Sequence, residues 1–159
     1  MDYHQNISLY QKRIGSSIDV LANEMRQIID AIAKNPLITF RVKDPETLRK
    51  KMLLKNTQDI FLIDDVYGIR ILVESVNEAY EVLLKVSQTF SGYLDHDFIK
   101  EPGVRIHEPY KGKLLRLLQF VAYRNGAPFE IQITTVAFNG VNELLHEGYH
   151  CRKYQSFDL

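Results

Sequence analysis

FEIQITT, at residues 129–135, is the stretch that decides the fold of this chain. Apolar and polar residues alternate along it, which predicts a β-strand because successive side chains of a strand point to opposite faces. The core face would carry Phe129, Ile131 and Ile133. The opposite face would carry Glu130, Gln132 and Thr134. Such a polar face is either the solvent-exposed side of a sheet or the floor of a ligand site, and the strand alone leaves both interpretations open.

Turn and strand signals upstream place this strand in a sheet. Asn125-Gly126 is a strong signal for a tight hairpin turn, and it joins the strand to another predicted over residues 114–124. Further strands are predicted at residues 37–43, 66–73 and 93–99. An irregular stretch with prolines and glycines is expected at residues 100–113.

Helices are predicted around these strands. Apolar residues recur with helical spacing between residues 3 and 34, and Gly15-Ser16-Ser17 would divide this segment into two helices. Asp44 before Pro45 predicts a helix start, and Ser75 with Glu78 forms a capping-box pattern for another helix. A short helix is expected within residues 57–64, and a last one from residue 136 to about residue 154. The order predicts an α+β fold: a mixed sheet of about five strands flanked by helices, with a helical N-terminus.

Composition narrows the class of protein. The 159 residues suffice for one domain, and we expect N-terminal helices over residues 1–35 beside a core over residues 37–154. Twenty basic and twenty acidic residues give no net charge, which excludes a general polyanion binder. The single cysteine excludes a disulfide framework and a cysteine-based zinc site. No apolar run reaches the length of a membrane span and the polar start does not resemble a signal peptide, so a cytoplasmic protein without a membrane partner is expected.

Basic residues gather around the strand at residues 37–43 and the helix after it. Arg41 and Lys43 alternate onto one face of the strand end, and Lys51 lies about two turns into the helix. Three cations near a helix N-terminus suit a polyphosphate, because charge-assisted hydrogen bonds and free backbone amides both favour anions. A solvated basic face is the alternative.

An acidic residue stands at the start of the strand predicted over residues 66–73. Asp65 precedes this strand, and Gly68 within it leaves room for a ligand. Magnesium takes one or two protein carboxylates and obtains further oxygens from substrate phosphates. Asp65 with Glu130 on a neighbouring strand would meet that need. An ordinary helix-to-strand turn is the alternative.

Together these segments resemble the synthetase domain of RelA/SpoT proteins in its short form, the small alarmone synthetases. The matching segments are RVKDPETLRKKM at 41–52, DVYGIRI at 65–71, DFI at 97–99 and EIQITT at 130–135. The last helix adds Ala137, Asn139 and His146 at the family's spacing. The resemblance covers about residues 37–154, and it implies a nucleotidyltransferase-like mixed sheet that moves pyrophosphate from ATP to a ribose 3′-hydroxyl.

The resemblance also implies roles on the ATP side. ATP phosphates would be held by Arg41, Lys43 and Lys51, with Thr47 standing where the family often has Ser. Asp65 would hold Mg²⁺, the implied cofactor, and Arg70 would help to orient ATP. Glu130 would assist the metal or accept the proton of the attacking hydroxyl.

The acceptor side departs from the family pattern. The family's acceptor loop usually carries a tyrosine that stacks on guanine, followed by a serine and a histidine. Here the loop is longer, and counting back from Glu130 places the serine on Arg116 and the histidine on Leu118. Thr134 stands where many relatives have arginine. The remaining acceptor-side candidates are Tyr110 for stacking, Gln132 and Asn139 for positioning, and His146, Lys111 and Arg105 as further contacts.

Three functions are compatible with this pattern. The first is synthesis of guanosine tetra- or pentaphosphate in the stringent response, with ATP and GDP or GTP as partners. The second is the same chemistry at the 3′ end of tRNA, as in a toxic branch of the family, with an antitoxin protein as a further partner. Basic residues such as Arg105 and Lys111 suit RNA phosphates, and a merely divergent loop explains them equally well. The third is a catalytically weak domain that binds nucleotides or a partner.

Overall fold

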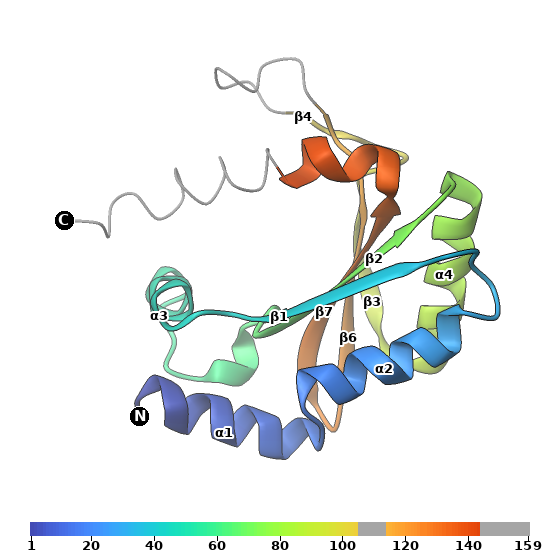
Figure 1. Cartoon of the computed structure of the whole chain (residues 1–159). Coiled ribbons are helices and arrows are strands. Elements are labelled where there is room, and N and C mark those ends of the chain that lie inside the picture. The colour runs from blue at the N-terminus through green and yellow to red at the C-terminus, as the bar shows by residue number, and fades with distance from the viewer. Residues whose placement is uncertain (105–113, 144–159) are drawn as a thin grey trace.

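A five-stranded mixed β-sheet forms the centre of the molecule (Figure 1). This computed structural model describes residues 1–104 and 114–143. The strand order is β1-β2-β7-β6-β3. The strands are β1 (Leu37–Val42), β2 (Tyr67–Val73), β7 (Ala127–Thr135), β6 (Leu118–Arg124) and β3 (Ser91–Asp97). β2 and β7 run parallel and the other neighbours antiparallel, which confirms the predicted α+β fold with a mixed sheet.

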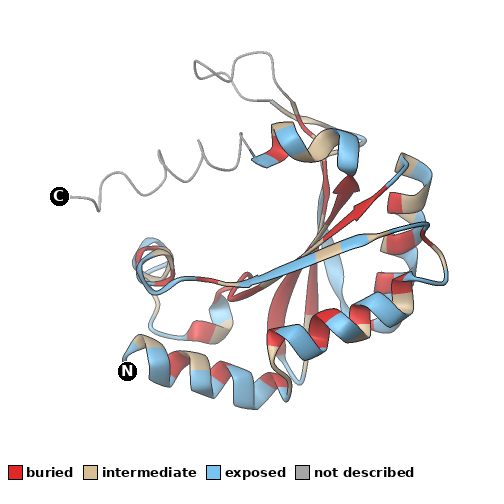
Figure 2. Cartoon of the chain, in the orientation of Figure 1, coloured by how far each residue is buried: buried red, intermediate tan, exposed pale blue. Residues whose placement is uncertain are grey.

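One face of the sheet is covered by helices. They are α1 (Tyr3–Ile14), α2 (Ile18–Ile29) and α4 (Val76–Thr89). α3 (Pro45–Leu54) follows β1 at one end of the sheet, and a short 3₁₀ helix, η1 (Ile60–Leu62), precedes β2. Buried residues recur between exposed ones along α1 and α2 (Figure 2). They share one apolar core with α4 and with Phe129, Ile131 and Ile133 of β7, so the predicted core face of β7 is confirmed. Within the described residues, no helix is long and apolar enough to cross a membrane.

The predicted helix break and N-caps are confirmed, whereas the capping box predicted at Ser75 and Glu78 is only half formed, because the Glu78 carboxylate accepts the Lys34 backbone N–H. Gly15 ends α1 with φ 76°, a left-handed conformation that glycine adopts without steric cost. The Asp44 carboxylate accepts the Thr47 backbone N–H at the start of α3, and Ser75 does the same for Glu78 at the start of α4. The two N-terminal helices and the starts of α3 and α4 were therefore readable from sequence.

The hairpin between β6 and β7 fixes which residues face each other. Asn125 and Gly126 have φ 53° and φ 77°, as a tight hairpin turn of this kind requires. The resulting register pairs Val121 with Glu130 and Gln119 with Gln132. Because paired residues lie on the same face of a sheet, Gln119 of β6 lies on the face that carries Glu130 and Gln132, not on the core face.

The prediction of one continuous strand over residues 114–124 is wrong. It divides into β5 (Leu114–Leu115), which pairs with β4 (Gly103–Val104) in a separate two-stranded sheet, and β6. The break falls at Arg116, whose backbone N–H donates to Asn142 Oδ1 at 2.8 Å. The same side chain donates its Nδ2 to the Arg116 carbonyl at 2.7 Å. A side chain from the helix that begins at residue 136 thus takes the backbone bonds that a continuous strand would use.

Candidate active site

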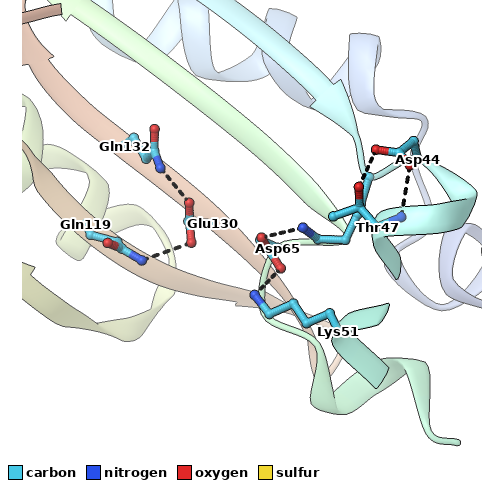
Figure 3. Close-up of polar contacts among 8 residues, drawn as sticks. Asp44, Thr47, Lys51, Asp65, Gln119, Glu130 and Gln132 are labelled. Carbon is cyan, nitrogen blue, oxygen red and sulfur yellow. Dashed lines mark hydrogen bonds and ion pairs between the residues drawn. The ribbon is translucent and has the colours of Figure 1, made fainter. Parts of the chain in front are cut away.

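Two lysines converge on one aspartate at the edge of the uncovered face. Lys43 follows β1, Lys51 lies on α3, and Asp65 precedes β2. Lys43 Nζ lies 2.8 Å from Asp65 Oδ2. Lys51 Nζ lies 2.7 Å from Asp65 Oδ1, and Figure 3 shows Lys51 pointing to this carboxylate. Lys43 is only 3% exposed, so the alternative of a solvated basic face is wrong for this residue.

The charge state of this cluster follows from its contacts. Burial by itself raises the pKa of Asp65, but the charges of Lys43 and Lys51 outweigh it and hold that pKa well below its usual range. Burial lowers the pKa of Lys43, and the Asp65 carboxylate opposes that shift. Asp65 is therefore a fixed anion between two cations, and the cluster carries a net positive charge.

The start of α3 differs from the expectation of free backbone amides. Asp44 Oδ1 accepts the Thr47 N–H at 2.9 Å, and Asp44 Oδ2 accepts the Thr47 hydroxyl at 2.7 Å. Both polar groups of Thr47, a predicted ATP contact, are thereby engaged at the helix cap. The lysine side chains, rather than the N–H and hydroxyl of Thr47, provide the positive charge at this end of the helix.

Glu130 lies on the polar face of β7 and is only 8% exposed. The Nε2 of Gln119 donates to Glu130 Oε2 at 3.0 Å, and the Nε2 of Gln132 donates to Oε1 at 2.8 Å (Figure 3). Burial raises the pKa of Glu130, and the charge of Asp65 adds to this effect. The interpretation of this face as an ordinary exposed surface is therefore wrong.

A chain of polar contacts continues from Glu130 across the sheet. Arg70 on β2 donates its Nε to Gln132 Oε1 at 3.3 Å. The Nη1 of Arg70 forms an ion pair with Glu143 at 3.1 Å. Glu143 belongs to the helix that begins at residue 136, so the contacts connect that helix with β2, β7 and β6.

A cavity of about 480 Å³ on the face of the sheet opposite the helices is lined by Arg70, Glu130, Gln132 and Glu143 of this network. Its walls include Arg41 from β1, Gly68 and Arg70 from β2, Glu130 and Gln132 from β7, and Glu143. A Cβ built on Gly68 would lie 3.7 Å from both Cγ and Nε of Arg41, so Arg41 lies directly over the glycine. The cavity therefore combines two guanidinium groups with a buried carboxylate.

The acceptor-side candidates are less completely placed. Asn139 is half-buried in the helix that begins at residue 136, and its Oδ1 is buried without a hydrogen-bond partner among the described residues. Arg105, Tyr110, Lys111 and His146 lie outside the described residues. Thr134 is buried and its hydroxyl donates to the Arg116 carbonyl at 2.6 Å. The residue that replaces the family's arginine thus supports the break between β5 and β6.

Two residues of the site were missed from sequence, Gln119 and Glu143. The hairpin turn carried a usable signal for Gln119, because its register places Gln119 opposite Gln132 on the face of Glu130. Leu118, the position counted for the family's histidine, is fully buried in the core instead. Glu143 had no such signal, since its position depends on how its helix packs.

Among the described residues, the carboxylates of this site form a pair rather than a closed metal centre. The described part of the chain holds no group of three or more His, Cys, Asp or Glu that would bind a metal ion by itself. Asp65 and Glu130 provide a pair of carboxylates whose charges interact. Such a pair suits Mg²⁺ when substrate phosphates provide further oxygens.

Comparison with known proteins agrees with this geometry. A sequence profile of the region found in RelA/SpoT proteins matches residues 40–155. No protein in the curated set matches the chain significantly by sequence. Among solved structures, small alarmone synthetase 2 from Bacillus subtilis is similar with a TM-score of 0.67 and 22% identity, over 100% of this chain and 84% of that one.

Two further structures show the same fold. A GTP pyrophosphokinase family protein from Streptococcus pneumoniae has a TM-score of 0.61 and 20% identity, over 98% of this chain and 80% of that one. Small alarmone synthetase 1 from Bacillus subtilis, bound to its product pppGpp, has a TM-score of 0.61 and 20% identity, over 84% of this chain and 75% of that one. The profile match spans most of the chain, and the chain belongs to the RelA/SpoT family.

Proposed function

We propose that the chain is a pyrophosphokinase-like transferase that moves pyrophosphate from ATP to the 3′-hydroxyl of GDP or GTP. The observation that carries this proposal is the cavity that Arg41 and Arg70 line together with the buried Glu130, in a site that also holds the lysine pair on Asp65. Family membership supports it. Small alarmone synthetase 1 has been solved with pppGpp and with AMPCPP, which supports nucleotides as ligands.

The donor side of the cavity would hold the ATP phosphates. Arg41, Lys43 and Lys51 provide positive charge, and Lys43 is fixed in place by Asp65 within a buried environment. Charges that are positioned before substrate arrives need no reorganisation during the reaction, and they stabilise a phosphoryl-transfer transition state most effectively. Arg70, which is held by a hydrogen bond to Gln132 and an ion pair with Glu143, would orient the nucleotide.

Asp65 and Glu130 would hold Mg²⁺. Each Asp65 oxygen accepts one lysine hydrogen bond, and a carboxylate oxygen has a second lone pair available. Bound Mg²⁺ supplies positive charge that balances the negative charge of the phosphates. Burial and the charge of Asp65 raise the pKa of Glu130, and a cation near both carboxylates would offset their repulsion.

Glu130 would act as the proton acceptor. In the proposed reaction the 3′-oxygen of the acceptor bonds to the β-phosphorus of ATP, the bond from that phosphorus to the α-phosphate oxygen breaks, and AMP leaves. The hydroxyl proton passes to Glu130, whose raised pKa makes it a better base than an exposed glutamate. Its place in the cavity wall gives it access to a bound acceptor.

The acceptor is identified by a labelling experiment. The protein is incubated with ATP labelled at the β-phosphate and, in turn, with GDP, GTP and deacylated tRNA. We expect label on GDP or GTP. Label on tRNA alone would contradict the guanine-nucleotide acceptor and favour the toxin, with an antitoxin as the partner to seek. No label on any acceptor would contradict the enzyme and favour a binding domain.

A further inference from the structure

The carboxylate of Glu130 is held by two amides that come from different strands. Gln132 lies two residues along β7 from Glu130, whereas Gln119 lies across the hairpin on β6. We propose that Gln119 is a positioning residue for the reaction, because its amide fixes the second oxygen of the Glu130 carboxylate over the cavity. This inference rests on the proposed function of Glu130 as the proton acceptor.

Gln132 cannot hold both oxygens of the carboxylate. Its carbonyl oxygen accepts from Arg70 Nε, and because an arginine only donates, the amide nitrogen of Gln132 must face Glu130. That nitrogen is bound to Oε1. Oε2 depends on a donor from another element, and Gln119 provides it at 3.0 Å.

The neighbouring position on β6 offers no replacement. Val121 lies directly opposite Glu130 in the hairpin register, and its side chain has no hydrogen-bond donor. Gln119 is one pair further along, opposite Gln132, and its longer side chain reaches back to Oε2. The hairpin turn at Asn125 and Gly126 therefore sets the distance on which this contact depends.

Two amides on opposite oxygens restrict rotation of the carboxylate about its last torsion. A proton acceptor must hold its lone pair toward the reacting hydroxyl, and an error of about 1 Å costs on the order of a hundredfold in rate. Loss of Gln119 would leave Oε2 buried without this donor. Among the described residues, no hydrogen bond joins Gln119 to Lys43 or Lys51. We therefore expect ATP binding to be unchanged when Gln119 is replaced.

The test compares a side chain that cannot donate with one that can. Gln119→Met keeps a similar length without a donor, Gln119→His retains an N–H donor, and Gln88→Met makes the same change at an exposed position of α4. We expect Gln119→Met to lower kcat by about tenfold to a hundredfold and to change the Kd of AMPCPP by less than about twofold. Gln119→His should recover most of kcat, and Gln88→Met should match the wild type.

Equal loss of kcat and AMPCPP binding in Gln119→Met, or no rescue by Gln119→His, would overturn the positioning role. Thermal unfolding of each variant is measured beside the kinetics. Should Gln119→Met fail to fold, Gln119→Leu provides a second side chain without a donor. An unchanged kcat in either folded variant overturns the proposal.

A spectroscopic readout separates this inference from the proposed function. The ¹³C resonance of the Glu130 carboxyl carbon is identified in glutamate-labelled protein as the signal lost in Glu130→Gln. We expect it to move in Gln119→Met and to return toward its wild-type position in Gln119→His. An unmoved resonance overturns the contact itself. A moved resonance in a protein without transferase activity would retain the contact and contradict the proposed function.

Discussion

Asp65 and Glu130 are equally buried, at 8% exposure, yet their environments shift their pKa values in opposite directions. Asp65 lies between two lysine ammonium groups, which hold its pKa well below the usual range. Glu130 is held by two neutral amides, and burial raises its pKa. The comparison teaches that the kind of partner, not the depth of burial, decides the charge of a buried acid. Two carboxylates in one site thereby suit two roles, a fixed anion and a proton acceptor.

Among the changes that test the comparison of Asp65 with Glu130, Glu130→Gln is expected to have the largest effect on activity. The glutamine is nearly isosteric but accepts no proton, so kcat should fall by about a hundredfold to ten-thousandfold. AMPCPP should still bind, because the lysines on Asp65 are unchanged. Steady-state kinetics and calorimetry measure the two quantities. Near-normal turnover of the variant would remove Glu130 from its assigned role.

The two ion pairs of Asp65 are tested by removing each lysine in turn. The Lys43 side chain is 2% exposed and the Lys51 side chain 16%, although both contact Asp65 at similar distances. Lys43→Met should lower the free energy of unfolding by about 3 kcal/mol, since it leaves one oxygen of the buried Asp65 carboxylate without its ion-pair partner. Lys51→Met should lower the free energy of unfolding by a smaller amount, because the Lys51 side chain is more exposed.

Urea denaturation at pH 7 measures both changes. Arg26→Met is a control at an exposed position of α2. A larger loss of stability for Lys51→Met than for Lys43→Met would contradict the assignment of Lys43 as the buried member of the pair.

The opposite pKa shifts predict opposite pH dependences. The depressed pKa of Asp65 contributes stability that is fully present above about pH 4, the pKa of an unfolded aspartate, and is lost as the pH falls toward the folded pKa. The raised pKa of Glu130 contributes stability that is present below about pH 4 and lost as the pH rises through its folded pKa.

Denaturation between pH 3 and pH 8 separates the two acids. The stability deficit of Asp65→Asn should shrink as the pH falls, whereas Glu130→Gln should gain stability relative to wild type as the pH rises above about 4. Parallel curves for the two variants would mean that both acids experience the same environment.

The smallest effect is expected at Gly68, which lies under Arg41. Gly68→Val would push the Arg41 side chain from its place over β2, whereas the single methyl of Gly68→Ala would meet Arg41 at an ordinary 3.7 Å. We expect the valine to raise KM for ATP a few-fold, on the order of 1 kcal/mol of binding, with little change in kcat. Equal effects of alanine and valine would show that Arg41 does not depend on this glycine.

Local patterns were sufficient to predict much of the fold and part of the site. The alternation around Glu130 predicted the strand and its two faces, and the Asp44 signal predicted the helix that carries Lys51. Each of these features depends on residues that are near one another in sequence.

Features that depend on distant side chains were not predictable in this way. The break at Arg116 is made by Asn142, 26 residues away, and the ion pair of Arg70 with Glu143 spans 73 residues. Neither contact leaves a periodic or capping signal. Gln119 lies between these cases, because the hairpin register predicts its face but not its hydrogen bond to Glu130.

The central claim is tested most directly with ATP labelled at the β-phosphate, GTP as acceptor, and the wild type beside Glu130→Gln. The account predicts that wild-type protein releases one AMP for each label that appears on the guanine nucleotide, and that Glu130→Gln binds ATP but transfers label at least about a hundredfold more slowly. Label that remains in ATP, or that appears only as ADP or free phosphate, would contradict pyrophosphate transfer at this site.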